Sequence, residues 1–240
     1  MALYDEIASF YDPWSRSVTE DVDFYVDEAL ASGGLVVELA VGTGRIAVPV
    51  ARAGIDVIGV DSSPGMLALA REAAEEAGVS QRVDLRLGDL REPPVDERVP
   101  LVICPFRSLL HMETENEKLR ALRAARGLLG PDGRFVFDVF SPSREDIDET
   151  DGRWLEREPG IFERADWDEG ARTLTLSVRS DGAMASFGLH WLSVPEWLRL
   201  LDAAGLTVEA VYGWFDRRPH DGEEDMIFVA RATAVESAGS

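Results

Sequence analysis

The chain has 240 residues, of which 45% are hydrophobic and one is a cysteine, and it carries a formal net charge of −21 at pH 7. This composition excludes a disordered chain and an intramolecular disulfide. The three histidines are scattered and predict no metal site. The acidic charge disfavours a nucleic-acid partner, because phosphate binding relies on Lys and Arg. No apolar run approaches the ~20 residues of a membrane span, and no basic segment precedes an apolar one at the start, so we expect a cytoplasmic protein without a membrane partner.

Short apolar runs alternate with helical segments along most of the chain, which is typical of an α/β protein with a parallel sheet. The runs predict strands over residues 35–40, 57–60, 83–87, 101–104, 134–140, 208–211 and 226–230. Capping residues at the start and glycines at the end predict helices over 62–78, 114–130 and 193–205. Ser62 or Ser63 caps the first of these, and Pro64 follows at a position that favours helix initiation.

Residues 141–192 break this alternation. In "RTLTLSVRS", Leu174, Leu176 and Val178 recur at every second position, as in an antiparallel strand, and the segments before and after it can pair with it. We therefore expect an inserted β subdomain that covers the carboxyl ends of the parallel strands, where ligands bind in such sheets. The resulting division is a core over 1–140, the insert over 141–192, the end of the core over 193–232 and a flexible tail over 233–240.

A glycine-rich turn follows the first predicted strand, in "VVELAVGTGRIA". Gly42 and Gly44 allow close approach of a ligand to the backbone, and Asp61 at the end of the next strand suits the hydroxyls of a ribose. These features fit NAD and S-adenosylmethionine equally. Glu38 is poorly placed for a pyrophosphate and suits a ligand that carries an ammonium and a sulfonium. No tyrosine has a lysine four residues later, which disfavours a short-chain reductase, although an NAD-dependent oxidoreductase stays an alternative.

The segments "VVELAVGTGR", "VIGVDSSPGML", "GDL" and "LLGPDGRFVFDVF" follow one another with a characteristic order and spacing. In these motifs the chain resembles the class I S-adenosylmethionine-dependent methyltransferases. The segments "YDEIASFYDPW" at the start and "GWFDRRP" near the end are similar to small-molecule members of that family, such as glycine/sarcosine and amino-sugar N-methyltransferases. The resemblance implies a doubly wound, seven-stranded Rossmann-like sheet with the last strand antiparallel, here with a small antiparallel β insert. It also implies methyl transfer from S-adenosyl-L-methionine to N or O of a small molecule, with S-adenosyl-L-homocysteine as the product.

Carried over position by position, the resemblance implies a set of cofactor-binding residues. The loop against the methionine moiety comprises Glu38, Ala40, Gly42, Thr43 and Gly44, and Ala40 stands where the family usually has glycine. The resemblance implies that Asp61 holds the ribose hydroxyls, with Ser62 and Met66 beside the adenosine, and that Gly88, Asp89 and Leu90 contact the adenine. It implies that Cys104, Pro105 and Phe106 close over the methionyl end. Tyr11 resembles the N-terminal tyrosine that covers the cofactor in this family.

The sequence names no catalytic residue, because methyl transfer depends mainly on holding the two reactants in line. Candidates for the substrate pocket are Trp14, Arg107, His111, His190 and Trp214. Cys104-Pro105 is the reverse of the Pro-Cys nucleophile of cytosine methyltransferases, which indicates a buried strand-end cysteine. A catalytically silent adenosylmethionine-binding regulatory protein is a further alternative, and we expect a monomer or a homodimer.

Overall fold

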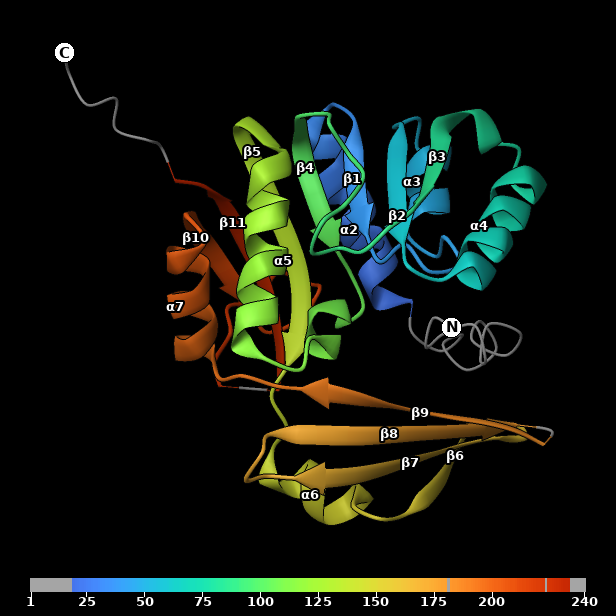
Figure 1. The fold of residues 1–240 in the computed structure, drawn as a ribbon, viewed down its shortest axis with the longest axis vertical. Coiled ribbons are helices and arrows are strands. Elements are labelled where there is room, and N and C mark those ends of the chain that lie inside the picture. The colour runs from blue at the N-terminus through green and yellow to red at the C-terminus, as the bar shows by residue number, and fades with distance from the viewer. Residues whose placement is uncertain (1–18, 181, 223, 234–240) are drawn as a thin grey trace.

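The computed structural model describes residues 19–180, 182–222 and 224–233, which form two sheets with helices around the larger one (Figure 1). Tyr11, Trp14 and nearly all of the predicted tail lie outside the described residues. Within the described ranges, no helix is long and apolar enough to cross a membrane.

The larger sheet has seven strands in the order β10-β11-β5-β4-β1-β2-β3. Its strands are β1 (Val36–Leu39), β2 (Val57–Asp61), β3 (Val83–Leu87), β4 (Val99–Cys104), β5 (Leu129–Phe140), β10 (Leu206–Tyr212) and β11 (Asp225–Ala232). β11 pairs antiparallel with both β5 and β10, while β1 to β5 pair in parallel. The predicted seven-stranded sheet with an antiparallel last strand is therefore confirmed.

Helices cover both faces of this sheet (Figure 1). One face carries α2 (Glu20–Ser32) and α3 (Ala47–Arg52), and the other carries α5 (Glu115–Leu128) and α7 (Val194–Ala203). The helix α4 (Pro64–Glu76) packs on β2 and β3. Buried apolar side chains of alternate strand positions, such as Val36 and Val37, point to opposite faces, which explains why the strands are apolar throughout.

The helices begin with the predicted capping chemistry. Of the two predicted candidates, Ser63 caps α4 and accepts a hydrogen bond from Met66 N at 3.1 Å. Ser193 and Glu196 form the capping box of α7. The helix α5 ends at Leu128 rather than at Gly130, because Leu129 already pairs with Val99 as part of β5.

Residues 141–192 form the second sheet, with four antiparallel strands. They are β6 (Trp154–Glu158), β7 (Ile161–Asp168), β8 (Thr173–Ser180) and β9 (Ala183–His190). The predicted alternation in β8 is confirmed, since Leu174, Leu176 and Val178 are buried. The sequence interpretation missed β6 and the short helix α6 (Arg144–Thr150), although Ser143 and Asp146 form a recognisable capping box.

The second sheet lies across the carboxyl ends of the parallel strands (Figure 1). The buried side chains of its inner face, including Leu174 and Phe187, belong to the same apolar cluster as those under α5 and α7. In this arrangement the carboxyl ends of β1, β2, β4 and β5 face the second sheet.

Candidate active site

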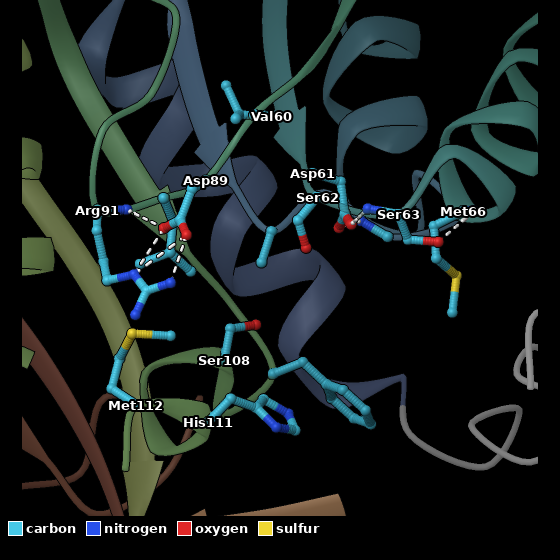
Figure 2. Close-up of a pocket in the computed structure, with 15 residues that line it drawn as sticks. Val60, Asp61, Ser62, Ser63, Met66, Asp89, Arg91, Ser108, His111 and Met112 are labelled. Carbon is cyan, nitrogen blue, oxygen red and sulfur yellow. Dashed lines mark hydrogen bonds and ion pairs between the residues drawn. The ribbon is translucent and has the colours of Figure 1, made fainter. Parts of the chain in front are cut away.

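A first cavity of ≈ 230 Å³ opens at the carboxyl ends of the strands. Figure 2 shows Asp61 and Ser62 from the end of β2 and Asp89 from the segment after β3, with Ser108 and His111 of the 3-10 helix η3 (Ser108–His111) on the opposite side. Its described lining is Ala40, Gly42, Val60, Asp61, Ser62, Ser63, Met66, Gly88, Asp89, Leu90, Arg91, Phe106, Ser108, His111 and Met112.

The glycine turn forms one wall of this cavity. Gly42 has a φ of 55°, and a Cβ placed there would meet nothing within 4 Å, so the turn leaves open space beside its backbone. Its N–H donates to Asp61 Oδ2 at 2.9 Å, and Ser63 N donates to Asp61 Oδ1 at 2.8 Å. Asp61 therefore holds the turn as well as lining the cavity.

Glu38 lies beneath the turn and is only 2% exposed. Among the described residues, its Oε2 has no hydrogen-bond partner. Burial raises the pKa of this carboxyl well above its usual value, and Arg45 opposes the shift. A buried, incompletely satisfied carboxylate fits a positively charged ligand group beside it, because a cation would offset the cost of desolvation.

Asp89 lines the cavity, but its carboxylate is bound to Arg91. The two oxygens accept from Arg91 Nε at 2.9 and 3.1 Å and from Arg91 Nη2 at 2.5 Å. Hydrogen bonding from Arg91 lowers the pKa of Asp89. Arg91 also pairs with Glu117 on α5 at 2.5 Å. Asp89, which was expected near the adenine, therefore belongs to a chain of ion pairs that the sequence did not indicate.

The structure brings together Ala40, Gly42, Asp61, Ser62, Met66, Gly88, Asp89, Leu90 and Phe106 on the first cavity, all expected from the sequence. The lining does not include five further residues expected at the cofactor: Glu38, Thr43, Gly44, Cys104 and Pro105. Cys104 is a free, fully buried thiol, and burial raises its pKa. Gly44 packs its backbone against Val48 and Ala70, so it serves the join between α3 and α4.

A second, larger cavity of ≈ 560 Å³ lies between the ends of the parallel strands and the inner face of the second sheet. Ala165, Leu174, Leu176 and Leu189 give it an apolar roof. Aromatic rings occupy much of the remaining wall: Phe106, Phe140, Trp167, Phe187, Trp214 and Phe215.

Acidic residues outnumber basic ones around the second cavity. Its described lining includes two arginines, Arg107 and Arg157, and seven acidic residues: Glu20, Asp21, Asp138, Asp146, Glu163, Glu224 and Asp225. Some of these charges are balanced, because Asp225 pairs with Arg107 at 2.8 Å and Glu163 pairs with Arg157 at 3.1 Å. The cavity as a whole suits a cationic molecule with an apolar body.

Phe106 and His111 line both cavities and therefore mark where the two adjoin. The ring of His111 packs at a tilt of 53° against Phe187 of β9, with 5.4 Å between the ring centroids. Burial, with a smaller effect from Lys118, lowers the pKa of His111 to about 4, while a hydrogen bond to the backbone of Gly188 opposes the shift. The imidazole is therefore neutral at pH 7.

The remaining candidates for the substrate pocket divide between two places. Arg107 and Trp214 line the second cavity. His190 lines neither cavity, because Phe187 and Leu189 of the same strand face the cavity and His190 lies on the other side of the sheet. Its pKa is lowered by burial and by Lys118.

Asp138 is the main residue that the sequence interpretation missed. It is 6% exposed, lines the second cavity and accepts three hydrogen bonds. The available signal was an acid within the apolar run "FVFDVF", near the carboxyl end of a strand. Among the described residues, no group of three or more His, Cys, Asp or Glu side chains is arranged to hold a metal ion.

Comparisons with known proteins agree with this geometry. The family described as "Methyltransferase domain" matches residues 36–133. The structure of the CcbJ methyltransferase from Streptomyces caelestis is similar with a TM-score of 0.80 and 28% identity, over 91% of this chain and 98% of that one.

Two of the curated relatives match over part of the chain. The putative methyltransferase YqeM of Bacillus subtilis is 29% identical over 58% of this chain and 53% of its own length. The glycine/sarcosine N-methyltransferase of Halorhodospira halochloris is 29% identical over 52% of this chain and 47% of its own length. The chain thus spans about half the length of these curated relatives.

The open space beside Gly42, the buried Glu38 carboxylate and the end of β2 at Asp61 fit a nucleoside that carries positive charge on its other moiety. The cofactor that meets this description is S-adenosylmethionine, in agreement with the methyltransferase matches. The fold and the matches together support a class I S-adenosylmethionine-dependent methyltransferase.

Proposed function

We propose that the protein transfers a methyl group from S-adenosylmethionine to a nitrogen or oxygen atom of a small molecule, with an amine nitrogen favoured. The observation that carries this proposal is the pair of cavities that share Phe106 and His111. The first cavity has the features of a donor site, and the second lies beside it under the inserted sheet. Reaction requires donor and acceptor to meet in line, and the shared boundary offers that place.

The donor would lie against the turn at Gly42, with its ribose near Asp61 and its ammonium near Glu38. When bound, it supplies an activated methyl group on a sulfonium. The chain itself orients the reactants and limits access of water, since the apolar inner face of the second sheet roofs the second cavity. We include residues 141–192 in this proposal as a lid over the acceptor.

Two observations favour an amine as the acceptor. The second cavity combines an excess of carboxylates with aromatic rings, and both attract ammonium groups. The glycine/sarcosine N-methyltransferase among the relatives is named for an amine substrate. A polyanionic acceptor is disfavoured by the net charge of −21.

The test is release of S-adenosylhomocysteine from methyl-labelled S-adenosylmethionine with pairs of small amines and alcohols of matched carbon skeleton. We expect faster turnover with some amines than with the matched alcohols, and loss of both binding and turnover in Gly42→Val. Tight donor binding without any turnover would instead indicate a silent binding protein. Saturable binding of NADH, followed by fluorescence, would favour the oxidoreductase alternative.

A further inference from the structure

Phe106 and Arg107 follow β4 at the boundary of the cavities, where Phe106 lines both of them and Arg107 lines the second. Both have left-handed backbone conformations, with φ values of 58° and 59°. Each such conformation in a residue other than glycine is strained and persists only where the surroundings hold it. Two in succession at the boundary of a binding site therefore require a specific support.

Asp138 on β5 provides this support from both carboxylate oxygens. Oδ1 accepts from Phe106 N at 2.8 Å, and Oδ2 accepts from Arg107 N at 3.0 Å. Oδ1 also accepts from the hydroxyl of Tyr25 on α2 at 2.5 Å. All three donors are neutral, and Tyr25 is fully buried, so the carboxylate is fixed in one orientation.

A second chain of contacts holds the ring of Phe106. The guanidinium of Arg45 lies 4.7 Å from the ring centroid, and Arg45 binds both oxygens of Asp21 at 2.7 and 2.5 Å. Asp21 and Tyr25 are one turn apart on α2. The same helix thus supports the backbone of Phe106 through Asp138 and its ring through Arg45.

We propose that Asp138, oriented by Tyr25, is a positioning residue for methyl transfer, because it fixes the Phe106–Arg107 turn that separates donor from acceptor. This inference rests on the proposed methyl transfer at the same site. It assigns the control of alignment to a carboxylate that needs no contact with either reactant. The positioning role of Asp138 depends on the ionisation of its carboxyl. In this respect it differs from the role of a residue that only stabilises the fold.

Ionisation matters because a protonated carboxyl carries its proton on one oxygen. That oxygen donates a hydrogen bond and is a weaker acceptor for a backbone N–H. Burial raises the pKa of Asp138 to about 6, while the hydrogen bond from Tyr25 lowers it. The charged or titratable groups that face Asp138 are Tyr25 and Asp21 of α2, Cys104 of β4, and Arg107. Below pH 6 the turn should lose part of its support, and kcat should fall with it.

Two variants test this role. Asp138→Asn replaces one carboxylate oxygen with an NH2 group, so one of the two backbone N–H groups loses its acceptor. The variant should lower kcat roughly ten- to a hundredfold, as expected for a small misplacement of reactants. The KM for the donor should stay within about twofold, and the acidic limb of the kcat–pH profile should disappear. Tyr25→Phe removes only the hydroxyl, so this limb should move to higher pH.

Matched controls separate positioning from stability. Tyr212→Phe removes a hydroxyl that does not contact Asp138, and it should leave the pH profile in place. Glu28→Gln alters a buried carboxylate that pairs with Arg134 and Arg217 away from both cavities, so it should lower stability without shifting the limb.

Amide NMR of the complex with S-adenosylhomocysteine gives a readout without any acceptor. The Phe106 and Arg107 amide resonances should titrate near pH 6 in the wild type, at higher pH in Tyr25→Phe, and not in Asp138→Asn. Unchanged amide titrations in both variants, or an acidic limb that stays in place in Tyr25→Phe, would overturn the proposal. If no acceptor is methylated, the proposed function fails, whereas the amide titrations still decide whether Asp138 holds the turn.

Discussion

The backbone N–H of Gly42 donates to Asp61 Oδ2 at 2.9 Å and thereby ties the turn after β1 to the end of β2. The other carboxylate oxygen accepts from Ser63 N at 2.8 Å, at the start of α4. One side chain therefore joins three elements around the first cavity. This relationship changes what removal of the carboxylate should do.

Asp61→Ala should weaken binding of S-adenosylhomocysteine by roughly ten- to several-hundredfold, since charge-assisted hydrogen bonds to the ribose are lost. The loss of the acceptor for two backbone N–H groups should also lower the free energy of unfolding by about 1–3 kcal/mol. Calorimetric titration and urea denaturation measure the two effects. Asp56→Ala is the control, because Asp56 precedes β2 at its other end and pairs at the surface with Arg82. Equal affinities of both variants would contradict the assignment.

Glu38→Gln should stabilise the ligand-free protein and weaken donor binding. A carboxyl whose pKa is raised in the folded state contributes stability at low pH and loses it as the pH rises through the raised pKa. The amide has no such loss, so the stability difference between the variant and wild type should grow as the pH rises. Urea denaturation of both proteins between pH 5 and pH 9, roughly the range in which buried carboxyls with raised pKa values titrate, measures this difference in the free energy of unfolding. Parallel curves for the two proteins would refute it.

Ala40→Gly should stabilise the fold. Ala40 has a φ of 59°, which costs about 1–2 kcal/mol for an L-residue, while glycine adds roughly 0.4–1 kcal/mol of unfolded-chain entropy. The net gain in the free energy of unfolding should be about 0.5–1 kcal/mol. Ala53→Gly is the matched control, because Ala53 has a φ of −74° and should lose stability. Thermal denaturation of both variants decides the sign.

The strands and most helix ends were predictable because local pattern determines them. Apolar runs bounded by polar segments gave all seven strands of the larger sheet, and Ser63 and Ser193 cap helices as their spacing indicates. The segment around β6 was not recognised, because "WLERE" has too few apolar residues to show alternation. Its pairing with β7 is set by contacts rather than by its own composition.

The site was predictable where a motif carries it and not where distant residues meet. Gly42, Asp61 and Asp89 stand in recognisable motifs. The bond from Tyr25 to Asp138 joins residues 113 positions apart, and no local pattern encodes such a contact. Glu38 and Asp138 share one sequence feature, because each is an acid inside an apolar strand.

The inserted sheet should exchange its amide hydrogens faster than the core. Its outer face is open, with Met184 62% exposed, and local opening is easier where few apolar contacts must be broken. Hydrogen exchange of the ligand-free protein should therefore show less protection in β6 to β9 than in β1, β2 and β4. Equal protection of residues 150–190 and 35–60 would contradict a mobile lid.

Gly42→Val should abolish binding of S-adenosylhomocysteine, and Gly54→Val shows whether the cause is space or strain. Both glycines have positive φ values, 55° and 95°, and a Cβ at either would meet nothing within 4 Å. Both variants should therefore lose stability by about 1–3 kcal/mol through backbone strain. Only Gly42 lines the first cavity, so only its valine would occupy the space that the donor needs. Calorimetric titration of the two variants should give no measurable affinity for Gly42→Val and nearly wild-type affinity for Gly54→Val. Wild-type affinity in both would mean that the turn at Gly42 does not hold the cofactor.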